Sequence, residues 1–490
     1  MTEPSGTNKA QGKTTFDSQT TVRFYGGMAG AILPFMVFVS GVVAVALSGA
    51  PDEHGFWPIL ILALCVGLIL TKDRKNYCVS VIEGMSQPIV MIMITAWMLA
   101  SIIGVLMSTT GFVEALTWTA GRLHMGGAGF VILSFLICCV VSLSTGSSFG
   151  TILICGPILF PAGGLLGAHG PTLAGAILGG ATFGDCIAPI SDTTIASALS
   201  QKADIGGTVR SRLKYVLPAG AVALVFYTLS AVLRGQPAQS NAPELAGDPR
   251  GLPMLLIPVV IIFLLLKGRH LLHGLLAGLM VGVILALIFS LLPLSRLFSL
   301  DPENFTASSF IIDGINRAVG ISFFTILLMG LISTVRASGL LSRLVDFSSQ
   351  RSRTIMHSEA WISATVGAAV LLTCHSIVAI LTVGEFARQT GEKIGIHRYR
   401  RANLLSLVVC TFPFLLPYFI PVILMASTTS SGSSYNIPPV SPLQTGLHNF
   451  TSWALLVMVL LAVMAGFGRY SDAKSDVGKT EEDKCSDSAI

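Results

Sequence analysis

Charged residues are scarce in this sequence. Asp, Glu, Lys and Arg make up 11% of its 490 residues, whereas a soluble domain carries roughly 25%. The nine cysteines show no CxxC spacing, so neither a disulfide framework nor a metal site is indicated. A phosphate loop, a Ser-His-Asp arrangement and an HExxH motif are also missing. We therefore expect neither an enzyme nor a cofactor, and the modest net charge of +5 gives no sign of nucleic-acid binding.

Hydrophobic residues are abundant instead, at 52% with a mean hydropathy of +0.76. Apolar runs of about 17–25 residues recur along the chain, which is the length of a bilayer-spanning helix. The first run is too long for a signal peptide, so we expect it to be retained. The sequence predicts an all-α polytopic membrane protein with about 10 spans, near 25–49, 56–71, 86–108, 172–200, 214–233, 251–266, 270–293, 314–336, 402–426 and 447–467.

Two longer apolar stretches, 128–165 and 357–389, are interrupted by the polar sequences STGSS (144–148) and TCHS (373–376). Both are too long for one straight span, so we predict two helical hairpins with broken helices. If both termini are cytoplasmic and each hairpin returns to its own side, the external loops keep only five basic residues. This asymmetry is what the positive-inside rule expects of a multi-pass plasma (inner) membrane protein. The external residues would be Arg122, Arg234, Arg250, Arg296 and Arg317.

An internal repeat appears when the chain is shifted by 228 residues. The shift places Gly111 on Gly339, Thr145 on Thr373, Ser148 on Ser376 and Pro189 on Pro417. The two copies would start on opposite sides of the membrane, an inverted arrangement typical of secondary transporters. The predicted organisation is a cytoplasmic N-terminal tail (1–24), leading helices (25–71), a first transport repeat (72–213), connecting helices (214–313), a second inverted repeat (314–426), an external loop with the last helix (427–469) and a cytoplasmic tail (470–490).

The stretch GGATFGDCIAPISDTTIASA (179–198) contains Asp185 and Asp192 in apolar surroundings. An ionised Asp in the bilayer centre costs from about 2.5 kcal/mol upward, so it should face a cavity or a partner. We predict that Pro189 breaks the helix and that Gly184 loosens it. The break would gather carboxylates and hydroxyls suited to Na⁺ or a proton, from Ser191, Thr193 and Thr194. The alternative is that the aspartates cap half-helices.

The two hairpin tips supply further polar groups. In the first, Gly146 would let the backbone turn tightly beside the hydroxyls of Thr145, Ser147 and Ser148. In the second, Thr373, His375 and Ser376 are candidates for a substrate or proton contact. Alternatively, such hydroxyls bond back to their own helix, and the histidine is structural. The acids at span ends, Glu83, Glu114, Glu359 and Glu385, should be solvated or capping, and the cytoplasmic arginines should anchor the topology.

The string GDCIAPISDTT (184–194) resembles the signature of the NhaC-type sodium/proton antiporter family of the ion transporter superfamily, and STGSSFGT (144–151) resembles its second marked stretch. The resemblance covers about residues 60–425. The resemblance implies a scaffold domain, a mobile transport domain and a homodimer. It also implies Na⁺- and H⁺-linked transport, and in some members exchange of carboxylic acids such as malate and lactate. The functional positions it implies are Thr145, Gly146, Ser147, Ser148, Gly184, Asp185, Pro189, Ser191, Asp192, Thr193 and Thr194.

The second half departs from this pattern because Pro413 and Ile420 stand opposite Asp185 and Asp192, and Ala188 replaces the usual serine. One charged site is therefore expected, not a symmetric pair. We predict a secondary active transporter in the lipid bilayer that exchanges Na⁺ for H⁺ by alternating access. The alternative is a sodium- or proton-coupled carrier of a small organic acid or amino acid that uses the second tip.

Overall fold

The computed structural model describes residues 21–47, 53–122, 125–235, 249–267, 269–301, 306–349 and 354–469. Within them, nine helices are long and apolar enough to cross a membrane, or up to ten if a bent pair is counted as one span. The two strands found there, β1 (Ser299–Asp301) and β2 (Thr306–Ser308), pair antiparallel. The predicted all-α polytopic fold is therefore confirmed, while the tail at 470–490 and most of the tail at 1–24 lie outside the described residues.

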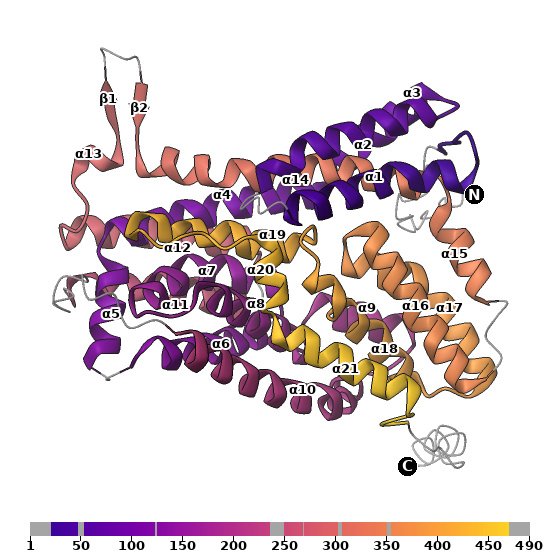
Figure 1. The fold of residues 1–490 in the computed structure, drawn as a ribbon. Coiled ribbons are helices and arrows are strands. Elements are labelled where there is room, and N and C mark those ends of the chain that lie inside the picture. Colours follow the sequence, from indigo (N-terminus) through magenta and orange to yellow (C-terminus); the bar gives the residue numbers. More distant parts are fainter. Residues whose placement is uncertain are drawn as a thin grey trace, which may run out of the picture.

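One group of helices surrounds α14 and is called the α14 unit below. In it, α14 packs against α2, α3 and α4, while α12 packs against α4 and α11. These helices form the upper layer of Figure 1 and part of its left side. The unit comprises α1 (Met28–Leu47), α2 (Trp57–Leu70), α3 (Arg74–Met85), α4 (Pro88–Thr109), α11 (Leu256–Leu266), α12 (Leu271–Ile288) and α14 (Phe310–Ala337).

The remaining spans form a second group, called the hairpin unit. Its most extensive packing is between α6 and α8, and α10 packs along α21. It comprises α6 (Gly127–Thr145), α7 (Ser148–Leu165), α8 (Gly170–Ile187), α9 (Asp192–Ser200), α10 (Ile205–Arg234), α16 (Ile355–Thr373), α17 (Ser376–Ile394), α18 (Arg398–Val409), α19 (Ile420–Thr428) and α21 (Phe450–Met464).

Short elements lie between these longer helices. They are the helices α5 (Phe112–Arg122), α13 (Leu294–Leu297), α15 (Leu340–Ser349) and α20 (Pro442–Leu447), and the 3-10 turns η1 (Glu53–Phe56), η2 (Pro249–Leu255), η3 (Phe412–Leu415) and η4 (Thr429–Tyr435). Three predicted boundaries, after residues 213, 313 and 426, fall inside α10, α14 and α19. Continuous helices thus carry the chain across those positions.

The predicted hairpins are present, as α6 with α7 and α16 with α17. The first lies in the left half of Figure 1 and the second in the right half, so they enter from opposite ends. Each turns through one left-handed residue, Gly146 (φ 66°) and Cys374 (φ 46°). Glycine adopts this conformation without a steric penalty, whereas cysteine does so at a cost.

The 228-residue repeat is visible in the backbone itself. Helix α6 (127–145) and helix α16 (355–373) are offset by 228 at both ends, and so are α9 (192–200) and α19 (420–428). The residues that follow the two tips have matching dihedral angles, −144° and 115° at Ser147 and −140° and 115° at His375. Because the copies enter from opposite ends, the repeat is inverted.

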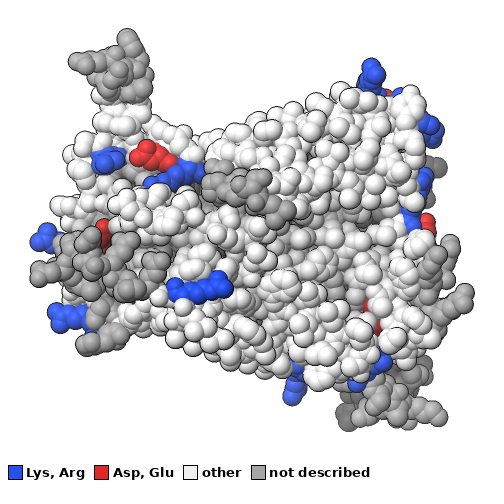
Figure 2. Space-filling model, in the orientation of Figure 1, with Lys and Arg blue, Asp and Glu red and all other residues white. Residues whose placement is uncertain are grey.

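Charge is concentrated at the ends of the molecule. Figure 2 shows Lys and Arg mainly toward its left and right ends, with uncharged surface over most of the centre. The prediction for some charged residues is nevertheless wrong. Glu359 is fully buried and pairs with Arg400 at 2.9 Å and with Arg469 at 2.8 Å. Arg212 is also fully buried, so these side chains are not solvated residues of a surface loop.

Candidate functional site

The helix that carries the aspartates is broken between α8 and α9. Four residues, 188–191, separate the two helices, and Pro189 lies among them. Proline has no backbone N–H and cannot continue the helical bonding. Gly184, which was expected to loosen the helix near the break, lies inside the continuous helix α8. A Cβ atom there would collide with the carbonyl oxygen of Cys139, so Gly184 instead allows α8 to approach α6 closely.

Asp185 is the buried carboxylate of this region, with 7% of the residue exposed. The Ser191 hydroxyl donates a hydrogen bond to its Oδ1 atom at 2.6 Å. The Thr193 hydroxyl lies 3.0 Å from that of Ser191, and the Ser148 hydroxyl also interacts with the Asp185 carboxyl. Such a short bond from a hydroxyl is typical of an ionised acceptor. Ser191 from the break and Ser148 from the first tip thus place hydroxyls at one carboxylate, and Thr193 contacts Ser191.

Asp192 occupies a different position. It is exposed and stands at the first residue of α9. A negative charge there interacts favourably with the positive end of the helix dipole. The two aspartates therefore differ, with Asp185 held inside and Asp192 placed at the helix start.

Both hairpin tips and both helix breaks line a single cavity of about 80 Å³. This volume holds several water molecules. From the first repeat the lining includes Gly146, Ser147, Ser148, Asp185, Ser191, Asp192 and Thr193. From the second it includes Cys374, His375, Ser376, Cys410, Phe414, Phe419, Ile420 and Pro421. The first side is rich in oxygen atoms, while the second is largely apolar apart from its tip.

Three predicted hydroxyls lie outside this lining. Thr194 accepts a hydrogen bond from Arg212 at 2.8 Å, and Thr373 donates to the Ala369 carbonyl at 2.8 Å. The Thr145 hydroxyl is buried and has no hydrogen-bond partner among the described residues. Pro417 lies in the second break, between α18 and α19. The helical segments on either side of that break are bent by 48°.

Arg212 belongs to the basic residues that were expected to anchor the topology at a cytoplasmic loop, but it lies buried in this region. Its guanidinium donates to the Cys186 carbonyl at 2.8 Å and to the Asn403 side chain at 3.0 Å, besides its bond to Thr194. It therefore supplies a donor to the end of α8, where backbone carbonyls lack helical partners. Residue 212 lies a few residues before an apolar run, so its burial could have been suspected only if α10 had been extended back to residue 205.

Unpaired side-chain nitrogens are found near the second tip. The Nδ1 atom of His375 and the Nε and Nη2 atoms of Arg336 are buried and have no hydrogen-bond partner in the described part of the chain. Arg336 ends α14, which packs against α16, and it interacts electrostatically with Cys374 and His375. Buried polar groups normally find a partner, so this cluster calls for a ligand or water.

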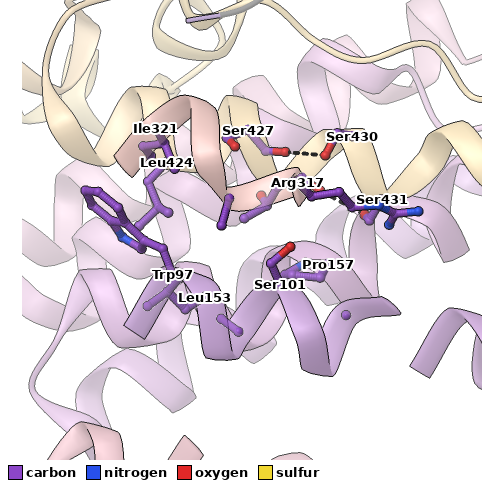
Figure 3. Close-up of a pocket in the computed structure, with 14 residues that line it drawn as sticks. Trp97, Ser101, Leu153, Pro157, Arg317, Ile321, Leu424, Ser427, Ser430 and Ser431 are labelled. Carbon is purple, nitrogen blue, oxygen red and sulfur yellow. Dashed lines mark hydrogen bonds between the residues drawn. The ribbon is translucent and has the colours of Figure 1, made fainter. Parts of the chain in front are cut away.

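A second cavity, of about 40 Å³, lies where the two units meet. Figure 3 shows Trp97, Ser101 and Arg317 of the α14 unit facing Leu153, Pro157 and Ser427 of the hairpin unit. The Ser430 hydroxyl donates to the Ser427 carbonyl at 2.7 Å, so it is occupied by its own chain. None of the predicted site residues line this cavity, which is a packing gap between the units.

Comparison with known proteins gives a consistent result. Residues 15–232 match the pattern of the Na⁺/H⁺ antiporter family. The chain is 28% identical over 204 residues to the malate-2H⁺/Na⁺-lactate antiporter of Bacillus subtilis, over 42% of this chain and 41% of that one. It is 29% identical over 170 residues to the Na⁺/H⁺ antiporter NhaC of Alkalihalophilus pseudofirmus, over 35% and 36% of the two chains.

A third relative is the arginine/ornithine antiporter ArcD of Halobacterium salinarum, 32% identical over 151 residues that cover 29% of this chain and 31% of that one. The matched segments thus span only about two fifths or less of the curated relatives' own length. They are named for different substrates, but all three are antiporters. Residues 15–232 are therefore similar to the Na⁺/H⁺ antiporter family, as the resemblance of the GDCIAPISDTT motif predicts.

Proposed function

We propose that this protein exchanges Na⁺ for H⁺ across the membrane, with Asp185 as the group that binds one or the other. The observation that carries the proposal is the buried Asp185 carboxylate, bonded to Ser191 and open to a cavity between two hairpin tips. Intramembrane carboxylates with this kind of access are typical of cation and proton pathways. Ser147, Ser148, Ser191 and Thr193 would add neutral oxygen ligands, and Asp192 would attract the cation at the opening.

Competition for one carboxylate is sufficient for exchange. A bound proton neutralises Asp185 and removes the charge that holds Na⁺, and bound Na⁺ in turn disfavours the proton. Each crossing then carries one kind of cation, so the gradient of one drives the other. The pair of packed units supports the crossing step, because a rigid hairpin unit moving against the α14 unit would expose the site to alternate sides. The packing gap of Figure 3 lies on that boundary.

The test uses everted vesicles that hold a pH gradient. Addition of NaCl should collapse the gradient in the wild type, and Asp185→Asn should reduce this response about 100-fold, since loss of a charged hydrogen-bonded ligand costs up to about 3 kcal/mol. The matched control is Glu385→Gln, which removes an exposed carboxylate on α17. A full response in Asp185→Asn at wild-type expression would overturn the proposal.

We also propose the orientation, with both termini cytoplasmic at the plasma membrane. Cysteine substitutions at 166–171 should react with an impermeant reagent added outside intact cells, and those at 392–400 should react only after permeabilisation. The reverse labelling pattern would show that the orientation is opposite to the one proposed, and it would leave the site assignment unchanged.

A second candidate is exchange of a small organic acid coupled to Na⁺ or H⁺. It is favoured by the unpaired nitrogens of Arg336 and His375, which could hold a carboxylate at the second tip. The same arginine would repel a cationic substrate such as arginine or ornithine. Proteoliposomes with a Na⁺ gradient should then accumulate labelled lactate or malate but not arginine, and Arg336→Gln should abolish the uptake. Uptake of neither acid, together with Na⁺/H⁺ exchange, would exclude this candidate.

A further inference from the structure

A cavity of about 230 Å³ lies away from the candidate site, at the end of the molecule where α1 begins. It is formed where the segment before α1, the turn between α2 and α3, and the first turns of α15 meet, on the right of Figure 1. Among its described lining residues three are basic, Arg23, Lys72 and Arg343, and none is acidic.

Backbone hydrogen bonds hold these three segments together. The Lys72 amide donates to the Arg23 carbonyl at 2.8 Å, and the Val22 amide donates to the Ala337 carbonyl, at the end of α14, at 3.0 Å. Arg343 stands one turn into α15, its amide bonded to the Gly339 carbonyl at 3.3 Å. The positions of the three cations are therefore set by the fold and not only by flexible side chains.

The described residues include no acidic partner for these three cations. Among the residues described, no ion pair joins Arg23, Lys72 or Arg343 to a carboxylate, although all three converge on one cavity. The neighbouring acid Asp73 is engaged elsewhere, because it accepts a hydrogen bond from the Asn76 amide as the cap of α3. Like charges brought together repel one another, and an anion bound between them would remove that cost.

The surroundings match the boundary between lipid tails and headgroups. Phe24 and Ala31 are buried beneath the cavity, while Tyr25 beside it is 58% exposed. The Lys72 ammonium lies 5.5 Å from the centre of the Tyr25 ring. Tyrosine and lysine at a span end are typical of the membrane interface. Helix α15 adds an amphipathic helix there, with Leu340 buried and Arg343 exposed.

We propose that this cavity binds the phosphate group of an anionic phospholipid. Phosphate suits the site because each arginine can offer two parallel N–H donors and the lysine a third point charge. The apolar residues below would contact the start of the acyl chains. Basic pockets between spanning helices are a physical means of holding anionic headgroups. This proposal is independent of which ion or acid the protein carries, because no residue of the candidate site takes part.

The test compares lipid retention by the full-length protein purified in detergent. Native mass spectrometry with phosphatidylglycerol, phosphatidylcholine or inorganic phosphate separates a lipid headgroup from a free anion. We expect one phosphatidylglycerol to be retained selectively, and Arg23→Gln/Lys72→Gln/Arg343→Gln to bind it about 100-fold more weakly, since each basic residue contributes about fivefold.

Two controls guard against misfolding and general charge effects. The triple variant Arg122→Gln/Arg234→Gln/Arg296→Gln removes the same charge from exposed positions at the ends of α5 and α10 and in α13, and it should retain the lipid. Arg23→Lys/Arg343→Lys, which keeps the charge, should also bind. Equal binding by both Gln triples, equal retention of phosphatidylcholine, or displacement of the lipid by millimolar inorganic phosphate would each overturn the proposal.

Discussion

The two repeats have nearly the same backbone around the cavity but different chemistry. Ser147, Ser191, Asp192 and Thr193 of the first repeat correspond, at an offset of 228, to His375, Phe419, Ile420 and Pro421 of the second. Helix α19 begins at Ile420 with no side-chain cap and no acid in its first turn. A half-helix can therefore start here without a carboxylate, which argues against capping as the sole reason for Asp192. The difference shows that the break is a property of the backbone pattern and the acids are an addition to it.

The largest expected effect is a loss of stability when Arg212 is replaced, an arginine that only the first repeat has. Position 440, opposite Arg212, is a valine. Arg212→Gln should lower the stability by about 3–5 kcal/mol, because it leaves the acceptors Cys186, Thr194 and Asn403 without their buried donor. Thermal unfolding in detergent measures this. A melting temperature within 2 °C of the wild type, roughly the shift of a sub-kcal change, would show that the break does not depend on Arg212.

A smaller effect is expected at the hydroxyl that bonds Asp185. Ser191→Ala removes the 2.6 Å bond and should weaken the apparent affinity for Na⁺ about tenfold. The corresponding change in the second repeat, Phe419→Leu, should alter it much less, since no ligand is lost. The comparison is made from the Na⁺ concentration that gives half of the maximal exchange rate. If the two variants weaken the apparent affinity for Na⁺ equally, the site is not confined to the first repeat.

The two tips should differ modestly in stability. Ser147 accepts a hydrogen bond from the Gly150 amide at 3.1 Å and caps α7, whereas His375 makes no such bond at the start of α17. Ser147→Ala should cost about 1 kcal/mol. His375→Ala should lower the stability less, because it removes no capping hydrogen bond. Chemical unfolding of both variants gives the difference, and a greater loss for His375→Ala would reveal a partner that the described residues do not contain.

The smallest effect concerns acid pH. Burial, together with nearby His448 and Arg234, lowers the pKa of His169 below its ordinary 6.5, and burial lowers the pKa of His448. A histidine with a lowered pKa is favoured neutral in the folded protein, so its contribution is complete above pH 6.5 and is lost as the pH falls below it. The melting temperature of the wild type should therefore drop more between pH 7.5 and 5.5 than that of His169→Asn/His448→Asn. Equal drops would show that these histidines do not couple to folding.

Much of the fold could be predicted from local patterns. Hydropathy marked the spans, and the polar sequences within 128–165 and 357–389 marked both tips, because an apolar stretch too long for one span must turn. The inverted repeat followed from matching tips and prolines. Domain boundaries were less accessible, since α10 and α14 continue through polar or charged positions without a break.

The site was predicted less completely than the fold. Asp185, Ser191, Asp192 and Thr193 were named from one motif and do line the cavity. Thr194 and Thr145 belong to the two motifs but lie outside the cavity lining. Thr194 accepts a hydrogen bond from Arg212, and Thr145 is the last residue of α6. Arg212 was taken for a loop residue because burial of a charge depends on acceptors from α8 and α18, which are distant in sequence.

The sequence by itself determined the membrane class, the broken helix at Pro189 and the repeat, because hydropathy and backbone restriction act over a few neighbouring residues. Only the tertiary structure decided that tips 228 residues apart share one cavity with Asp185. It also decided that Glu359 and Arg212 are buried with partners and that Arg23, Lys72 and Arg343 converge. The physical reason is that burial and electrostatic partnership arise from contacts between distant segments, which no local pattern encodes.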